Sequence, residues 1–207
     1  LSYIDALIKE QQFDDAKQVL EQAKTQCVAE EKLNVLKTQL TPTAQLNEPT
    51  QQQISNLLEY YQNGRFNDAE KLAVSITNEF PKHQFSWKVL GAVLGATGRK
   101  SEAVDANRTA VALSPQDAEA HSNLGVTLKE LGRLDEAEAG YTQAIALKPD
   151  YVEAHRNLGI TLQELGRLDE ALASFTQAIA LKPDYAEAHN NLGVTLQELR
   201  RLDEAEA

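Results

Sequence analysis

A 34-residue period governs this chain. Four of its six prolines recur at this interval, at positions 81, 115, 149 and 183. Because proline lacks a backbone N–H and clashes with the preceding helical turn, each of them marks the end of a helix at the same point of a repeating unit. Two glycine series share the interval. The first comprises Gly91, Gly125, Gly159 and Gly193. The second comprises Gly64, Gly98, Gly132 and Gly166.

Each unit contains two amphipathic segments. In the first, Leu124, Leu128 and Leu131 fall on one helical stripe, and Gly132 suits the left-handed residue that ends a helix. The second spans residues 135–147, with acidic residues in its first turn, which favours helix formation there. We therefore expect helices near residues 84–97 and 101–113, with equivalents shifted by 34 and 68 residues, and no strand.

Small residues at fixed positions indicate how the helices pack. Gly125 and Ala137 allow two helices to approach closely, and Tyr141 or Phe175 fills the space beyond. One helix pair cannot bury its own apolar face, so neighbouring pairs must stack. The sequence predicts an all-α fold, a right-handed α-solenoid (superhelix) of antiparallel helix pairs. The residues expected to be buried between repeats are Leu124, Leu128, Ala137 and Tyr141.

The aligned units carry a recognisable residue pattern. It reads Trp87-x-x-Leu90-Gly91-x-x-Leu94 in one unit, and Leu124-Gly125-x-x-Leu128, Ala137-x-x-x-Tyr141 and Pro149 in the next. Period and residue types together resemble the tetratricopeptide repeat (TPR) family. The resemblance implies an array of helix pairs that binds other proteins.

The period covers only part of the chain. Repeats are expected to start near residues 50, 84, 118, 152 and 186, and the last one would be cut short within its second helix. Residues 1–40 break the period and are interpreted as a degenerate helical segment, a partial repeat plus an extra helix. Residues 41–49, bracketed by Pro42 and Pro49, are interpreted as a linker. The absence of methionine indicates a piece of a longer protein.

Composition argues against several classes of partner. The formal net charge of −11 disfavours nucleic acid and anionic membrane surfaces, which both reward clustered Lys and Arg. No apolar run approaches the roughly 20 residues of a membrane span, so no membrane insertion is expected. A single cysteine, Cys27, excludes an internal disulfide. We expect a cytoplasmic location.

Two patterns in the sequence resemble functional motifs, a histidine series and a glycosylation signal, but the repeat accounts for both. His121, His155 and His189 recur at 34 residues, but equivalent helices lie at least roughly 8–10 Å apart, whereas zinc ligands lie about 2 Å from the metal. Packing between repeats is therefore their expected role. The glycosylation pattern at Asn107 falls within an expected packed helix and is discounted. We predict no catalytic residues, metal or cofactor, and no enzymatic activity for this segment.

One polar series points to a ligand. Asn123, Asn157 and Asn191 recur immediately before the Leu-Gly landmark, where helix propensity does not favour asparagine. A carboxamide offers both donors and an acceptor, so a row of them can hold an extended peptide backbone. Alternatively, these asparagines cap or bridge neighbouring helices. The equivalent residues of the first two repeats are Ser55 and Val89.

The segment from Ala118 to Gly125 resembles repeats of bacterial and eukaryotic O-linked N-acetylglucosamine transferases. That resemblance implies an asparagine ladder that lines an inner groove and holds substrate backbones. It also implies further groove-facing positions, which are occupied here by Ser122, Arg156, Asn190, Lys129, Gln163 and Gln197, with Glu119, Glu153 and Glu187 along one edge. At the position directly before the asparagine series, only Lys88 and Arg156 offer positive charge, and they come from non-adjacent repeats, which disfavours a clamp for a C-terminal carboxylate.

These patterns predict a protein-protein interaction module that binds an extended peptide or protein segment in a concave groove. Two alternatives stay open. The chain could be the substrate-recruiting array of a larger bacterial transferase, joined to a glycosyltransferase, sulfotransferase or methyltransferase domain. It could also be a scaffold that self-associates through its N-terminal segment or through an uncapped C-terminal repeat.

Overall fold

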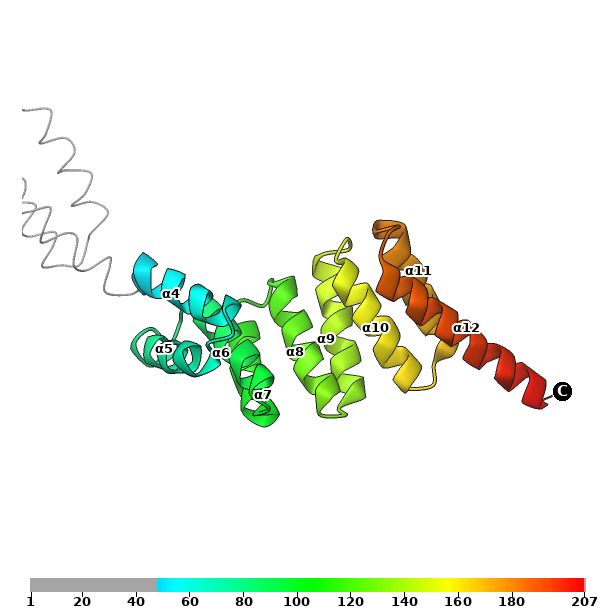
Figure 1. Cartoon of the computed structure of the whole chain (residues 1–207), viewed down its shortest axis with the longest axis horizontal. Coiled ribbons are helices and arrows are strands. Elements are labelled where there is room, and N and C mark those ends of the chain that lie inside the picture. The colour runs from blue at the N-terminus through cyan, green and yellow to red at the C-terminus, as the bar shows by residue number, and fades with distance from the viewer. Residues whose placement is uncertain (1–47, 207) are drawn as a thin grey trace, which may run out of the picture. The chain divides into compact units, whose positions relative to one another are not determined.

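The computed structural model describes residues 48–206, with side chains as far as residue 200. This part of the chain contains only α-helices, which confirms the expected all-α fold (Figure 1). They are α4 (Gln51–Gln62), α5 (Phe66–Glu79), α6 (Gln84–Ala96), α7 (Lys100–Leu113), α8 (Ala118–Glu130), α9 (Leu134–Leu147), α10 (Val152–Glu164), α11 (Leu168–Leu181) and α12 (Ala186–Glu206). The segment expected over residues 1–40, most of the linker at 41–49, and Cys27 lie outside the described residues.

Residues from Asn56 onward form one compact unit, and residues 48–55 belong to the unit before it. Within the later unit, α6 with α7, α8 with α9, and α10 with α11 pack as pairs, and each pair also contacts the next helix along the chain. The limits of α6 and α7 agree with the sequence expectation to within one residue. The unit is therefore a stack of helix pairs in sequence order (Figure 1).

A glycine ends the turn between the two helices of each pair. Gly64, Gly98, Gly132 and Gly166 have φ angles of 69°, 81°, 72° and 74°. L-residues with a Cβ adopt this left-handed region at a cost of roughly 1–2 kcal/mol, whereas glycine adopts it freely. The second glycine series of the sequence is thus explained by backbone conformation.

An arginine follows each of these glycines and closes the turn. Its guanidinium donates to the carboxylate three residues later, as Arg133 does to Glu136 and Arg65 does to Asp68. Arg167 also donates to Glu138 of the preceding repeat, at 2.6 Å. These exposed pairs contribute little stability singly, roughly 0.2–1 kcal/mol each, so glycine rather than charge determines the turn.

The first glycine series allows a large side chain to pack against a helix backbone. A Cβ atom built on Gly125 would lie 2.8 Å from the Tyr141 ring, and one on Gly159 would lie 2.6 Å from the Phe175 ring. Both rings are fully buried. This confirms the packing role expected for these glycines and aromatic residues.

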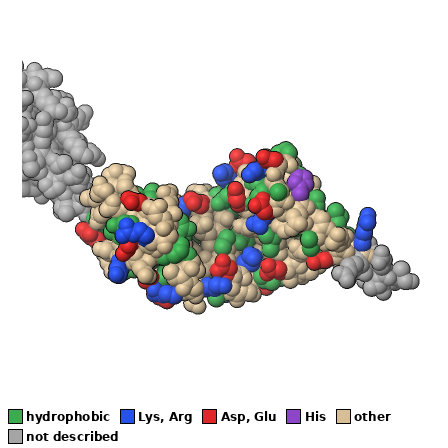
Figure 2. Space-filling model, in the orientation of Figure 1, with side chains coloured by type: hydrophobic (Ala, Val, Ile, Leu, Met, Phe, Trp, Pro, Cys, Tyr) green, Lys and Arg blue, Asp and Glu red, His purple; other side chains and the backbone are tan. Residues whose placement is uncertain are grey.

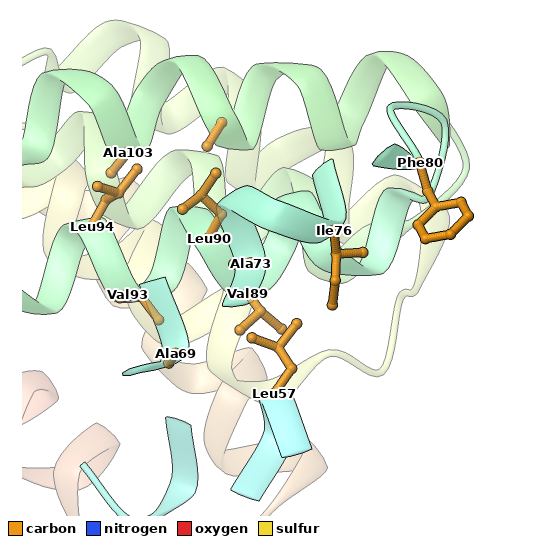
Figure 3. Close-up of a cluster of buried hydrophobic side chains, with 11 residues drawn as sticks. Leu57, Ala69, Ala73, Ile76, Phe80, Val89, Leu90, Val93, Leu94 and Ala103 are labelled. Atoms are coloured by element: carbon orange, nitrogen blue, oxygen red, sulfur yellow. The ribbon is translucent and has the colours of Figure 1, made fainter. Parts of the chain in front are cut away.

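The apolar core follows the same repeat. Of the residues expected to be buried, Leu128, Ala137 and Tyr141 are buried, while Leu124 is partly buried at the margin of their cluster. Figure 3 shows the cluster of the first repeats, to which Leu57 of α4 and Val93 of α6 both contribute. The core thus continues from one helix pair to the next.

An aromatic ring near the start of α6, α8, α10 and α12 hydrogen-bonds the loop that precedes the helix. His155 Nε2 lies 2.9 Å from the carbonyl oxygen of Pro149, and Trp87 Nε1 lies 2.9 Å from that of Pro81. A carbonyl can only accept, so Nε2 of the histidine carries the proton. The same bond is made by His121 and His189. The histidine series therefore fixes the junction between successive repeats, as its expected packing role implies.

The last helix departs from the expected pattern. A second helix was expected to begin near residue 202, but α12 continues without a break from Ala186 to Glu206. Arg200 occupies the position of the left-handed glycines, and a side chain there makes the turn costly. The expectation of a second helix is therefore wrong, because the residue that would end the first one is absent. Val194 and Leu196 on α12 are 40% and 44% exposed.

The contact between glycine and aromatic ring can be tested with a matched pair of substitutions. We expect Gly159→Ala to lower the free energy of unfolding by about 1–2 kcal/mol, since overpacking outweighs the gain in helix propensity. Gly193→Ala, at the equivalent position of α12 with nothing within 4 Å of the new Cβ, should raise stability by about 0.5–1 kcal/mol. Urea unfolding of both variants measures the difference, and equal effects would contradict the packing account.

Candidate functional site

The first helices of successive repeats, α6, α8, α10 and α12, are neighbours and form one surface. We call it the first-helix face. Polar pairs join its helices: Lys129 Nζ lies 3.5 Å from Glu164 Oε1, and Gln163 Nε2 lies 3.0 Å from Glu198 Oε2. Two of the residues expected in the groove, Lys129 and Gln163, therefore also link neighbouring repeats, whereas Gln197 on α12 is exposed.

The three repeat asparagines lie half-buried on this face. Asn157 Oδ1 accepts from the adjacent Arg156 at 3.3 Å, while Asn191 Nδ2 is buried without a hydrogen-bond partner. Among residues 48–200, whose side chains are described, no hydrogen bond from the three carboxamides to another helix is present. The alternative in which they bridge neighbouring helices is thus not seen there, and the buried Nδ2 of Asn191 is left without a partner.

The backbone beneath each asparagine is fixed by a buried threonine. The hydroxyls of Thr127, Thr161 and Thr195 donate to the carbonyls of Asn123, Asn157 and Asn191 at 3.0, 2.9 and 2.8 Å. Threonine makes such bonds to the preceding turn when it lies inside a helix. This threonine series also recurs every 34 residues, and the sequence analysis did not single it out.

The residue directly before each asparagine varies in accessibility. Ser122 is buried, at 3% exposed, and its hydroxyl lies close enough to the Tyr151 phenol to lower the pKa of Tyr151, although burial of the phenol outweighs this and raises the pKa. Arg156 is half-buried and Asn190 is exposed. Ser122 was expected to contact a ligand, but the chain at the start of the following repeat covers it. Arg156 and Asn190 keep accessible surface.

Lys88, at the equivalent position of α6, is also buried. Its ammonium donates to Asp117 Oδ2 at 3.1 Å and to Glu119. Burial opposes the charge of Lys88, but these two bonds outweigh burial and raise its pKa. Because the ammonium is already neutralised within the protein, it does not offer a site for a C-terminal carboxylate.

Asp117 joins this ion pair to the start of α8. Its Oδ1 accepts from the backbone N–H of Glu119 at 2.9 Å and of Ala120 at 3.2 Å, and its Oδ2 accepts from Gln84 at 2.7 Å. Burial opposes ionisation, but the bonds from Lys88, Gln84 and the Ala120 amide outweigh it and lower the pKa of Asp117. The carboxylate therefore both caps α8 and connects two repeats.

A pocket of about 190 Å³ opens on the first-helix face. Asn123, one of the expected ligand contacts, forms part of its wall, and Asn107 from α7 also lines it. Its other lining residues are Tyr61, Gly91, Ala92, Gly95, Ala96, Val126, Thr127 and Glu130. The sequence analysis missed Asn107 as a site residue, although its alignment 34 residues before Tyr141 was a usable signal.

The described residues contain no other constellation that suggests chemistry. No group of three or more His, Cys, Asp or Glu residues in this part of the chain is placed to hold a metal ion. None of the described helices combines the length and apolar character needed to cross a bilayer. On the face drawn in Figure 2, Lys and Arg are interspersed with Asp and Glu.

Comparisons with known proteins agree on the repeat. Family models described as TPR repeat match residues 127–166 and 161–199, and those described as tetratricopeptide repeat match residues 107–139 and 57–118. No curated protein sequence matches the chain significantly.

Solved structures with the same fold include a crystal structure of MamA, with 23% identity and a TM-score of 0.66 over 74% of this chain and 84% of that one. The first TPR of Spaghetti (RPAP3) bound to the HSP90 peptide SRMEEVD has 25% identity and a TM-score of 0.56 over 56% and 93%. The Arabidopsis OM64 TPR domain has 25% identity and a TM-score of 0.53 over 54% and 93%.

The chain is an α-helical repeat protein of the kind that serves as an interaction module. Through residues 57–199, it belongs to the tetratricopeptide repeat family. The neighbours share its fold, and they do not show the resemblance to O-linked N-acetylglucosamine transferases that was expected from the sequence.

The role of Asp117 can be tested by its pH dependence. Asp117→Asn keeps the helix cap but loses the charge, and we expect it to lower stability by about 1 kcal/mol at pH 7. Because the folded pKa of Asp117 is lowered, its contribution is present above the unfolded value of about 3.9 and is lost as pH falls through the folded value. The unfolding midpoints of the unmodified chain and of Asp117→Asn, measured between pH 2 and 7, should therefore become equal at the acid end. A difference between the two proteins that stays constant over this range would contradict the assignment.

Proposed function

We propose that this TPR array binds an extended polypeptide along its first-helix face, with Asn123, Asn157 and Asn191 holding the ligand's backbone. The observation that carries the proposal is the lack of hydrogen bonds between these carboxamides and other helices within residues 48–200. A buried amide group without a partner, such as Asn191 Nδ2, is unfavourable by about 1–3 kcal/mol. A peptide backbone offers both the donor and the acceptor that would satisfy it.

The spacing of the three residues suits a chain that lies across several repeats. Each asparagine occupies the same position of its first helix, and successive first helices contact one another. Arg156 and Asn190 lie beside the series and would contact the ligand's side chains. Lys129, Gln163 and Gln197 would line the next row, and the pairs Lys129–Glu164 and Gln163–Glu198 hold two of them in position.

Peptide binding by a TPR structure has a precedent among the neighbours, because the RPAP3 repeat is bound to an HSP90 peptide. Recognition of a C-terminal carboxylate is not favoured in this chain, since Lys88 is paired with Asp117 and Glu119. We therefore propose backbone recognition of an internal, extended segment. Recruitment of substrates to a fused transferase, and self-association, would both be uses of this same face.

The test uses peptides selected from a random displayed library against the whole 207-residue chain. Replacing Asn123, Asn157 and Asn191 by Ala should weaken the binding of a selected peptide by roughly 1.5–4.5 kcal/mol, at about 0.5–1.5 kcal/mol for each hydrogen bond. Calorimetry measures the affinity. Folding should change little, because alanine is the better helix former.

His155→Ala is the matched control. It removes the bond to the Pro149 carbonyl and should lower stability without lowering the affinity for peptide. Unchanged affinity in the triple variant, with an intact circular dichroism spectrum, would show that recognition lies elsewhere. A library that yields no binder would also count against the proposal.

A further inference from the structure

The repeat formed by α6 and α7 carries smaller residues than those that follow at four positions that line the pocket on the first-helix face. These positions hold Ala92, Gly95, Ala96 and Asn107. The equivalent residues are larger throughout: Val126, Lys129, Glu130 and Tyr141 in the next repeat, and Ile160, Gln163, Glu164 and Phe175 in the one after. The four smaller side chains therefore all lie around the same pocket.

These smaller side chains explain the pocket physically. Asn107 stands where Tyr141 and Phe175 fill the space against a helix glycine, and a Cβ built on Gly95 would meet nothing within 4 Å. The resulting volume is about 190 Å³. An apolar cavity of about 150 Å³ is known to accommodate benzene, so this pocket has room for one aromatic ring.

The polar wall of the pocket has an unused hydrogen-bond acceptor. The Thr127 hydroxyl donates its proton to the Asn123 carbonyl at 3.0 Å, so it can only accept from Asn107 Nδ2, which lies 2.9 Å away. This fixes the orientation of the Asn107 amide and leaves Asn107 Oδ1 buried without a partner. The Asn123 carboxamide lies in the same wall. A buried acceptor in this state favours a ligand that brings a donor.

Charge at the rim does not favour a cationic ligand. Glu130 is the acidic residue that lines the pocket, and its carboxylate is paired with Lys100 Nζ at 3.6 Å. The remaining walls are contributed by small aliphatic side chains, by Val126 and by the ring of Tyr61. The pocket therefore suits a neutral ring with a hydrogen-bond donor at its end.

We propose that this pocket binds a tyrosine side chain of the extended polypeptide that occupies the first-helix face. The ring lies between the small residues of α6 and Val126, and the hydroxyl donates to the carboxamide oxygen of Asn107. The pocket thus reads one side chain, whereas the asparagine series reads only backbone. This inference rests on the proposed function and adds a sequence preference to it.

The experiment uses p-cresol as a probe for the tyrosine side chain and toluene as a probe for phenylalanine. Each is titrated into the isotopically labelled 207-residue chain, and amide chemical shifts are followed by NMR. We expect saturable shifts for p-cresol at Gly91, Gly95 and the Asn107 side-chain amide, with millimolar affinity, as befits a fragment. Toluene should bind at least threefold more weakly, because it leaves the acceptor without a donor.

Gly95→Gln closes the pocket with a side chain that Gln163 and Gln197 carry at the equivalent positions. The variant should fold, since glutamine is the better helix former and its Cβ meets nothing within 4 Å. It should weaken p-cresol binding at least tenfold. The matched control is Gly193→Gln, which also enters open space but lies outside the pocket, and it should leave the binding unchanged.

Library peptides selected against the unmodified chain should be enriched in tyrosine, and this enrichment should disappear with Gly95→Gln. The proposal is overturned if p-cresol fails to saturate, if toluene binds equally well, or if Gly95→Gln leaves either readout unchanged. The probe requires no peptide, so loss of the pocket proposal leaves the asparagine test intact. If p-cresol binds but no peptide does, the proposed function fails, and with it the assignment of the pocket to a polypeptide.

Discussion

The close contact between a side chain of the second helix and a glycine of the first helix determines how each repeat packs. Tyr141 and Phe175 are fully buried against Gly125 and Gly159, at a distance that leaves no room for a Cβ atom. This contact fixes how closely the helices of a pair approach. In α6 and α7 the same contact is made by Asn107, and the smaller group there leaves the pocket beside it.

The constraints that the sequence analysis used are local ones, and this is why the helices could be predicted. Proline and left-handed glycine act on the backbone of their own residue, so their spacing gives the limits of α6 to α11. The same rule, applied to Arg200, gives an unbroken α12. The expected second helix was wrong because the period was extended past a residue that cannot end the first helix at low cost.

The accessibility of the candidate site could not be predicted from the repeat alone. Ser122 and Lys88 occupy equivalent positions, yet each is covered by residues at the start of the following repeat, Tyr151 in one case and Asp117 with Glu119 in the other. The residue that precedes the helix differs between these two repeats, Asp117 in one and Tyr151 in the other, so the period does not predict what covers the site. The alignment shows that Asn107 replaces an aromatic residue. It lines a pocket, however, only because the fold places the small residues Ala92, Gly95 and Ala96 of α6 around the same space.

The asparagine series and the pocket together describe a surface that combines general and specific recognition. Carboxamides that hydrogen-bond a ligand's backbone accept many ligand sequences. A pocket for one aromatic ring restricts binding to ligands that carry such a ring. The net charge of −11 would add a preference for ligands without excess acidic residues. Such a surface suits a module that accepts a family of extended segments sharing one anchor residue.

The most direct measurement is an NMR titration of the chain with a selected peptide, in which the side-chain NH₂ resonances of Asn123, Asn157 and Asn191 are followed. Backbone recognition predicts that all three pairs of resonances shift and saturate together with the binding isotherm, since each carboxamide gains hydrogen bonds to the ligand. If the peptide binds while these resonances stay unchanged, the first-helix face does not hold the ligand as proposed.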